Sequence, residues 1–299
     1  MREEKAQGLL ARMKVGTLMR RTIQAALITL ARALPVTKST TVCAGPLKDA
    51  KAAYDTGDYA DALRLYKPLA ALGLVEAQFS LGIMYATGRG VTEDYKEAAR
   101  LYGLAAAQGD AEAAFYLGIM YAKGQGVTQD YKEAARLYGL AAAQGDALAA
   151  VLLGLLYNEG QGVAQDYEEA VRLYSLAAAQ GSSQAQTNLG VMYEQGQGVT
   201  QDYKEAVRLF GLAAAQGVEQ AQYNLGIMYA KGQGVIQDNV YAYMWFDVAA
   251  SRQHLNALKD RISIAKIMSA ADISKAQDLA EEYVKKSYNL KHKTWRESA

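Results

Sequence analysis

Hydrophobic and polar positions recur along most of this chain with a period of 36 residues. Each copy contains a leucine followed directly by glycine, and a tyrosine lies four residues after that leucine. The leucines are Leu81, Leu117, Leu153, Leu189 and Leu225, and the tyrosines are Tyr85, Tyr121, Tyr157, Tyr193 and Tyr229. A fixed period of this length is the sequence signature of stacked structural repeats. We therefore predict five tandem units, at 74–109, 110–145, 146–181, 182–217 and 218–253.

Two amphipathic helices are predicted in each unit. In the second unit, Ala113, Leu117 and Tyr121 lie four residues apart, on one face of a helix over 111–122 that we call helix A. An equivalent apolar face predicts helix B over 131–144. Because neither helix can bury its apolar face alone, neighbouring units have to stack and share a continuous core. The predicted fold is all-α, an α-solenoid of antiparallel helix pairs.

Polar residues and glycines mark the predicted helix ends. Asp130, with Glu133 three residues later, has the pattern of a capping box, in which the Asp carboxylate accepts backbone N–H groups of the first turn of helix B. The same pair recurs in three other units, as Asp94/Glu97, Asp166/Glu169 and Asp202/Glu205. Gly124 and Gly145 are predicted to end helices A and B in the left-handed conformation.

One glycine of every unit lies inside helix A, where it costs about 1 kcal/mol relative to alanine. In the second unit this residue is Gly118. A cost repeated in every unit has to be offset by packing. We therefore expect Gly118 to allow close approach of helix B, whose facing residues Ala134 and Ala141 are also small.

These residues match a known family. The pattern A-x-x-x-L-G-x-x-Y-x-x-G-x-G-V, followed by D-Y-x-x-A-x-x-x-Y/F-x-x-A-A-x-x-G, resembles the Sel-one-like repeat, a relative of the tetratricopeptide repeat, over 74–253. The segment 268–283 is similar to the helical cap of bacterial members. The resemblance implies a right-handed superhelix of antiparallel helix pairs that acts as an adaptor for protein complexes. The last unit departs from the pattern at Asn239, Tyr241 and Gln253.

The segments that flank the repeats differ from them in composition. Residues 1–44 contain eight Lys or Arg against two Glu, an apolar run at 23–36 and the small-residue pattern Val42-Cys43-Ala44. This order predicts a signal peptide cleaved after Ala44, and hence a periplasmic or secreted protein. A basic leader on a cytoplasmic protein is the alternative, and the protein contacts a membrane only if the leader is retained.

Two shorter segments complete the predicted domain organisation. Residues 45–73 align with the second half of a unit and are expected to form an N-terminal half-repeat or cap. Residues 254–299 are expected to form a C-terminal helical cap with a basic tail. The basic residues of this tail are Lys285, Lys286, Lys291, Lys293 and Arg296.

Composition and charge argue against several classes of function. Outside the basic leader the acidic residues outnumber the basic residues by five, so no electrostatic footprint for nucleic acid is present. The chain has one cysteine, Cys43, and two histidines, His254 and His292, without metal-type spacing. We expect no metal, no cofactor and no nucleic acid partner.

Catalytic patterns are also weak. The G-x-G of Gly124 and Gly126 lacks the preceding strand and the third glycine of a dinucleotide-binding fingerprint. Paired carboxylates are explained by helix capping, except Glu159 and Glu194. We predict a non-enzymatic scaffold. A hydrolase acting on cell-wall or β-lactam-like substrates is the alternative, because some cysteine-rich members of the resembled family are similar to such enzymes.

A candidate binding surface comes from the positions of helix A that differ between otherwise similar units. Side chains one turn apart would form a stripe that lines a concave groove, by analogy with tetratricopeptide arrays, and this groove would hold a peptide or helix of a partner protein. The candidate residues are Phe79, Thr87, Phe115, Tyr116, Lys123, Val151, Glu159, Thr187, Glu194, Gln195, Tyr223 and Lys231. Neutral variation on a solvent face, or burial of the aromatic residues between neighbouring A helices, are the alternatives.

Overall fold

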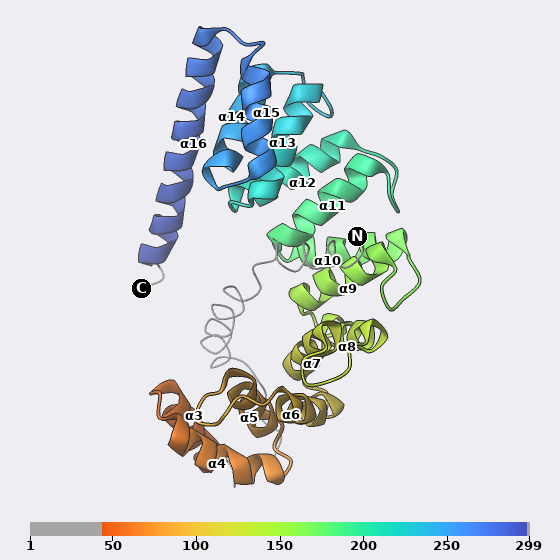
Figure 1. Cartoon of the computed structure of the whole chain (residues 1–299), viewed down its shortest axis with the longest axis vertical. Coiled ribbons are helices and arrows are strands. Elements are labelled where there is room, and N and C mark those ends of the chain that lie inside the picture. The colour runs from red at the N-terminus through yellow and green to blue at the C-terminus, as the bar shows by residue number, and fades with distance from the viewer. Residues whose placement is uncertain (1–43, 298–299) are drawn as a thin grey trace.

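The computed structural model describes residues 44–297, and the side chains of residues 45–286. Over this range helices are the only regular secondary structure, and they follow one another as pairs of a helix A and a helix B (Figure 1). The A helices are α3 (Ala44–Asp55), α5 (Val75–Thr87), α7 (Ala111–Lys123), α9 (Ala147–Glu159), α11 (Ser183–Gln195), α13 (Glu219–Lys231) and α15 (Leu255–Ala265). The B helices are α4 (Tyr59–Ala71), α6 (Tyr95–Ala107), α8 (Tyr131–Ala143), α10 (Tyr167–Ala179), α12 (Tyr203–Ala215), α14 (Asn239–Ser251) and α16 (Ala270–Glu297). The predicted α-solenoid is confirmed.

Local signals set the helix ends as the sequence indicated. In the second unit the Asp110 carboxylate accepts the backbone N–H of Ala113 at 2.7 Å and so caps α7. Gly124, with φ of +66°, ends the same helix, and Gly145, with φ of +94°, follows α8. Both glycines lie in the left-handed region that side chains disfavour, which confirms their predicted role.

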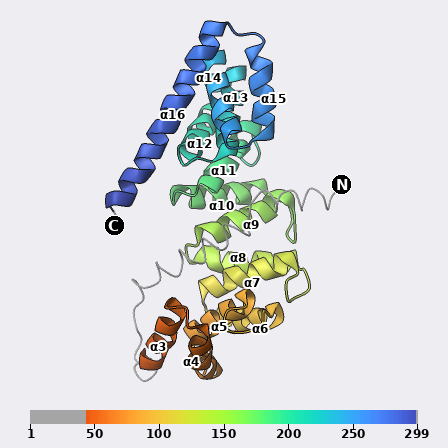
Figure 2. The same ribbon diagram turned by 60° about the vertical axis from the view of Figure 1, so that its left-hand side comes forward.

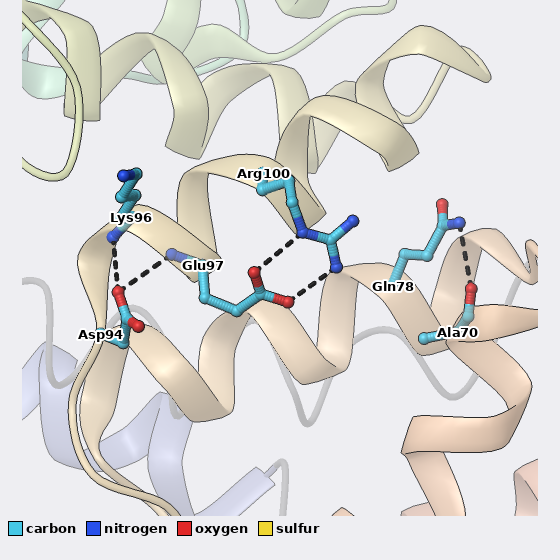
Figure 3. A network of polar contacts seen from close by, with 6 residues as sticks. All are labelled: Ala70, Gln78, Asp94, Lys96, Glu97 and Arg100. Atoms are coloured by element: carbon cyan, nitrogen blue, oxygen red, sulfur yellow. Dashed lines mark hydrogen bonds and ion pairs between the residues drawn. The ribbon is translucent and has the colours of Figure 1, made fainter.

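The start of helix B forms only one arm of the expected capping box. The Asp130 carboxylate accepts backbone N–H groups of Lys132 and Glu133 at 2.9 and 3.1 Å. The Glu133 carboxylate, however, accepts hydrogen bonds from Nε and Nη2 of Arg136 instead of returning to the Asp130 backbone. The reason is that the Asp130 N–H already donates to the Tyr121 carbonyl at 3.0 Å. Figure 3 shows the same arrangement one unit earlier.

The glycine inside helix A has a different partner from the one predicted. A Cβ atom on Gly118 would lie 2.8 Å from two ring carbons of Tyr138, closer than carbon atoms can approach without displacement. Small residues of helix B therefore do not account for Gly118, because a large aromatic ring of that helix fills the space. The same contact recurs in the other four units, between Gly82 and Tyr102, Gly154 and Tyr174, Gly190 and Phe210, and Gly226 and Phe246.

The second glycine of the G-x-G loop joins one unit to the unit before it. Gly126 has φ of +69°, and a Cβ there would lie 2.2 Å from the carbonyl oxygen of Tyr95 at the start of α6. The loop therefore packs directly on the backbone of the preceding helix B. This contact explains the G-x-G pattern structurally, without a phosphate ligand.

Side-chain hydrogen bonds also link successive units. The Gln144 amide at the end of α8 donates to the Gly109 carbonyl of the unit before at 3.1 Å. Gln108 and Gln216 bond Gly73 and Gly181 in the same way. The stacked units form an arc. One end of the arc is the pair α3 and α4, the other end is α16, and both ends lie on the same side (Figures 1 and 2).

Both ends of the array continue the alternation of helices. The segment 45–73, expected to be a half-repeat, holds almost all of a complete pair, α3 and α4. At the other end α15 begins 36 residues after α13 and continues the series of A helices. In α16, the Tyr283 hydroxyl donates to the Ala214 carbonyl at 2.8 Å, and its ring packs edge-on against Trp245. None of the described helices is both long and apolar enough to cross a membrane.

Candidate protein-interaction surface

Four of the twelve candidate residues lie in the core. Phe79 and Phe115 are each 7% exposed, and Val151 and Thr187 are 2% and 3% exposed. This position of helix A faces helix B of its own unit, as the ring contacts of Phe79 with Tyr102 and of Phe115 with Tyr138 show. These four side chains are therefore packing residues, and they offer almost no surface to a partner.

The two candidate tyrosines make contacts between units. Tyr116 is half-buried, and its ring lies 5.8 Å from both the Phe79 and Tyr102 rings of the preceding unit. Tyr223 donates a hydrogen bond to Asp260 of α15 at 2.8 Å and stacks on the His254 ring at 4.4 Å. Tyr223 thus attaches the terminal helix pair to the array, while Tyr116 keeps one accessible edge.

Helix A carries a stripe of mostly accessible side chains, which we call the open stripe. On α7 it consists of the half-buried Glu112, Tyr116 and Lys123 with the buried Ile119, which are spaced by four, three and four residues and therefore lie on one face. The equivalent residues of α5, α9, α11 and α13 lie 36 residues before or after. Most of these side chains are half-buried or exposed.

The remaining candidate residues lie at the C-terminal end of this stripe or beside it. Thr87, Lys123, Glu159, Gln195 and Lys231 are the last residues of their helices. All five are exposed or half-buried. Glu194, also half-buried, precedes Gln195 and borders the stripe. The structure thus places the charged candidates at the C-terminal ends of successive A helices and separates them from the buried Phe79 and Phe115.

The charges at this end are partly desolvated. Burial lowers the pKa of the Lys123 ammonium and raises the pKa of the carboxyls of Glu159 and Glu194. Lys231 opposes the rise in the pKa of Glu194. Within residues 45–286 none of these four side chains forms an ion pair. By contrast, the Glu133–Arg136 pair of α8 has an equivalent on the other B helices from α4 to α12.

A second charged cluster was missed by the sequence analysis. Glu112, at the N-terminal end of the open stripe, has its pKa raised to about 7 by burial and by the nearby carboxylates of Asp110 and Asp146. The signal that could have found it is the exchange of residues between units, because Leu148 and Gln184 occupy the same position in the next two units.

The described part of the chain contains no cluster of potential metal ligands. No group of three or more His, Cys, Asp or Glu side chains is placed there to hold a metal ion. The ring of His254 caps α15, because its Nδ1 accepts the backbone N–H of Ala257 at 3.2 Å. The Asp residues that start the repeats are occupied in the same structural role.

Comparison with family models matches the Sel1 repeat at residues 75–110, 111–146, 147–182, 183–218 and 219–254. These five matches cover more than half of the chain. The chain belongs to the Sel1 repeat family. Each matched Sel1 repeat starts one residue after the unit predicted from the sequence, and the period is the same. Comparison with curated proteins gives no match.

Solved structures of other Sel1 repeat proteins share the fold. A Sel1 repeat protein from Oxalobacter formigenes is 31% identical, with a TM-score of 0.68, and the match covers 80% of this chain and 96% of that one. The protective antigen c5321 of uropathogenic Escherichia coli is 28% identical, with a TM-score of 0.55, over 83% of this chain and 63% of that one. Sel1 repeat proteins are generally protein-interaction scaffolds, and their solenoid is typically non-catalytic.

Proposed function

We propose that this protein is a non-enzymatic adaptor that binds a partner protein through the open stripe of its A helices. The observation that carries the proposal is the contrast between scaffold and stripe. The scaffold residues recur in every unit, whereas the stripe varies among the units and includes partly desolvated charged side chains. Charged side chains that form no ion pair within the described residues are suited to pair with opposite charges on another protein.

Site-specific crosslinking tests this proposal. A photoreactive amino acid in place of Glu159, on the stripe, should crosslink to a partner from native extracts, which mass spectrometry then identifies. The same amino acid in place of Lys132, on α8, is the control and should not capture this partner. The charge reversal Glu159→Lys should reduce recovery of that partner, while Lys132→Glu should not. Equal recovery with both variants, in proteins of unchanged helix content, would contradict the proposal.

The hydrolase alternative rests on a family resemblance alone, and no group within residues 45–286 favours it. It is tested by turnover of the β-lactam nitrocefin. Turnover at the rate of a buffer blank is expected for an adaptor, whereas turnover that depends on protein concentration would replace the proposal with an enzymatic one.

We further propose that the adaptor acts outside the cytoplasm after cleavage following Ala44. The support is the order of basic, apolar and small residues in the first 44 positions. N-terminal sequencing of the protein from its native cells provides the test. A first residue of Gly45 is expected, and a retained leader would favour the cytoplasmic or membrane-tethered alternative.

A further inference from the structure

The open stripe changes character in the third unit. On α9 it consists of Leu148, Leu152, Leu155 and Glu159, so that three leucines form one apolar face. Leu148 is 37% exposed, and the other two leucines are half-buried. In the fourth unit Gln184 and Asn188 hold the first two of these positions, and their amides bond each other at 3.0 Å.

Leucine is therefore not needed at these positions to build the fold. The fourth and fifth units use a Gln and Asn pair there, and the same hydrogen bond forms between Gln220 and Asn224 at 2.9 Å. Apolar side chains that stay accessible and that the scaffold does not require indicate a contact with another molecule.

Carboxylates lie at both ends of this apolar face. Glu112 stands at the N-terminal end of the neighbouring α7, where burial and the nearby carboxylates of Asp110 and Asp146 raise its pKa. At the other end Glu159 is the last residue of α9, where the negative end of the helix dipole disfavours a carboxylate. Desolvation raises the pKa of Glu159, and its carboxylate forms no ion pair with another side chain of residues 45–286.

We propose that the open stripe of α9 and its neighbours α7 and α11 binds an amphipathic helix with an apolar centre and Lys or Arg residues at both ends. This inference rests on the proposed adaptor function and specifies the chemistry of the partner. Charge complementarity selects a basic segment, because each end of the apolar face presents a carboxylate without an ion-pair partner in residues 45–286.

The spacing of the leucines favours a helical partner. Residues separated by four and three positions form a stripe along one face of α9, and a second helix can pack along such a stripe. The 13 residues of α9 span about 20 Å, since each adds about 1.5 Å. The basic groups of a helical partner should therefore be about 12 residues apart.

A designed peptide provides the test. The probe is a fluorescein-labelled helical peptide of about 16 residues, with leucines at helical spacing in the centre and two lysines at each end, titrated with the full chain while anisotropy is recorded. The double variant Leu148→Gln/Leu152→Asn installs the residues of the fourth unit and should stay folded. It should bind the probe about tenfold more weakly or worse, because two apolar contacts are lost.

Matched controls make the outcome decisive. Leu140→Gln alters an equally exposed leucine of α8, 42% exposed, and should leave binding unchanged. A peptide with glutamates in place of the terminal lysines should bind about tenfold more weakly. A peptide with a central proline, which breaks the helix, should lose binding.

Three results would overturn the inference. They are equal binding by the double variant and wild type, equal binding of the lysine and glutamate peptides, and equal binding of the proline peptide. The adaptor function is judged separately, by recovery of the crosslinked partner with the charge-reversal variants. If Glu159→Lys reduces recovery of the crosslinked partner but the double variant binds the probe peptide as well as wild type does, the adaptor function is supported and this inference is wrong.

Discussion

At the scale of single residues, a glycine in helix A, which has no Cβ atom, sets the distance between helices A and B. Gly118 leaves room for the Tyr138 ring, and both residues are buried. The sequence showed that the helices approach closely, but not that an aromatic ring fills the space. Small residues on both helices suggested a small-on-small contact, because a sequence does not reveal which side of helix B faces the glycine.

The first prediction concerns the substitution Gly118→Ala. The new Cβ would lie 2.8 Å from ring carbons of Tyr138, so the ring or the helix has to move. We expect the free energy of unfolding to fall by about 1–3 kcal/mol, which exceeds the gain of about 1 kcal/mol in helix propensity. Urea unfolding followed by circular dichroism measures the change.

The matched control is Gly139→Ala in α8. The nearest atom to a Cβ there is a Leu153 methyl carbon at 3.9 Å, an ordinary contact distance. This variant should gain up to about 1 kcal/mol of stability. A loss of similar size in both variants would show that the ring contact does not control the effect at Gly118.

A second prediction concerns the pH dependence produced by Glu112. Its pKa in the folded protein is about 7 against an ordinary value of 4.5, so the folded state holds the proton more tightly than the unfolded state. Stability from this group is therefore fully present below about pH 4.5 and is lost as the pH rises through 7. Glu112→Gln should equal wild type near pH 4 and exceed it at pH 8 by about 1 kcal/mol, after allowance for solvent screening.

Thermal or urea unfolding at the two pH values checks this result. Glu76→Gln, the exposed equivalent on α5, is the control and should show no such difference between pH 4 and pH 8. The groups that face Glu112 are Asp110, Asp146 and Tyr116, and all remain in the variant. Parallel curves for wild type and Glu112→Gln would rule out an unneutralised carboxylate at this end of the stripe.

At the scale of the helices, local residues determined what the sequence could predict. Helix A of the second unit was expected at 111–122 and ends at Lys123, and helix B was expected at 131–144 and ends at Ala143. Both starts are fixed by an Asp side chain, and the glycines that follow stop both helices. Such signals act over a few residues and can be read directly from the sequence.

The exposed face of helix A could not be read in the same way. Helix A packs against helix B of its own unit and against the helices of neighbouring units, so it is apolar around most of its circumference. A helix of this kind has no clear polar face to mark the solvent side. Differences between units then mark core positions such as Phe115 and Val151 as well as accessible ones such as Lys123 and Glu159.

A third prediction separates the two parts of the expected capping box. Asp130→Ala removes an acceptor from two backbone N–H groups and should cost about 1 kcal/mol of stability. Glu133→Ala removes an ion pair with Arg136, a largely exposed side chain, and should cost at most about 0.5 kcal/mol. Urea unfolding measures both, and raising the salt concentration should reduce only the effect of Glu133→Ala. An equal cost for the two variants would indicate that Glu133 contributes to the cap.

At the scale of the whole molecule, the stability of the array is expected to be a sum of contacts between neighbours. Each helix B contacts its own helix A and the helix A of the next unit, and each G-x-G loop packs on the unit before. In such one-dimensional architectures each unit depends mainly on the units beside it. A unit can therefore be removed if the two surfaces brought together still fit.

The last prediction is that deletion of 147–182 leaves a folded and shorter array. The deletion joins Asp146 to Ser183, so Asp146 stays in place to cap α11, where Ala185 takes the position of Ala149 as the donor. Tyr138 would then take the place of Tyr174 beside Asn188, whose side chain opposes the rise that burial causes in the pKa of Tyr174 in the intact chain. The helical circular dichroism signal per residue should be unchanged.

Deletion of 147–164 alone is the control. It removes helix A of the unit but leaves α10 unpaired, so it should lower helix content and cause aggregation. Because the longer deletion also removes the three leucines of α9, it should abolish binding of the basic probe peptide. A folded deletion variant that still bound this peptide would place the site elsewhere on the array.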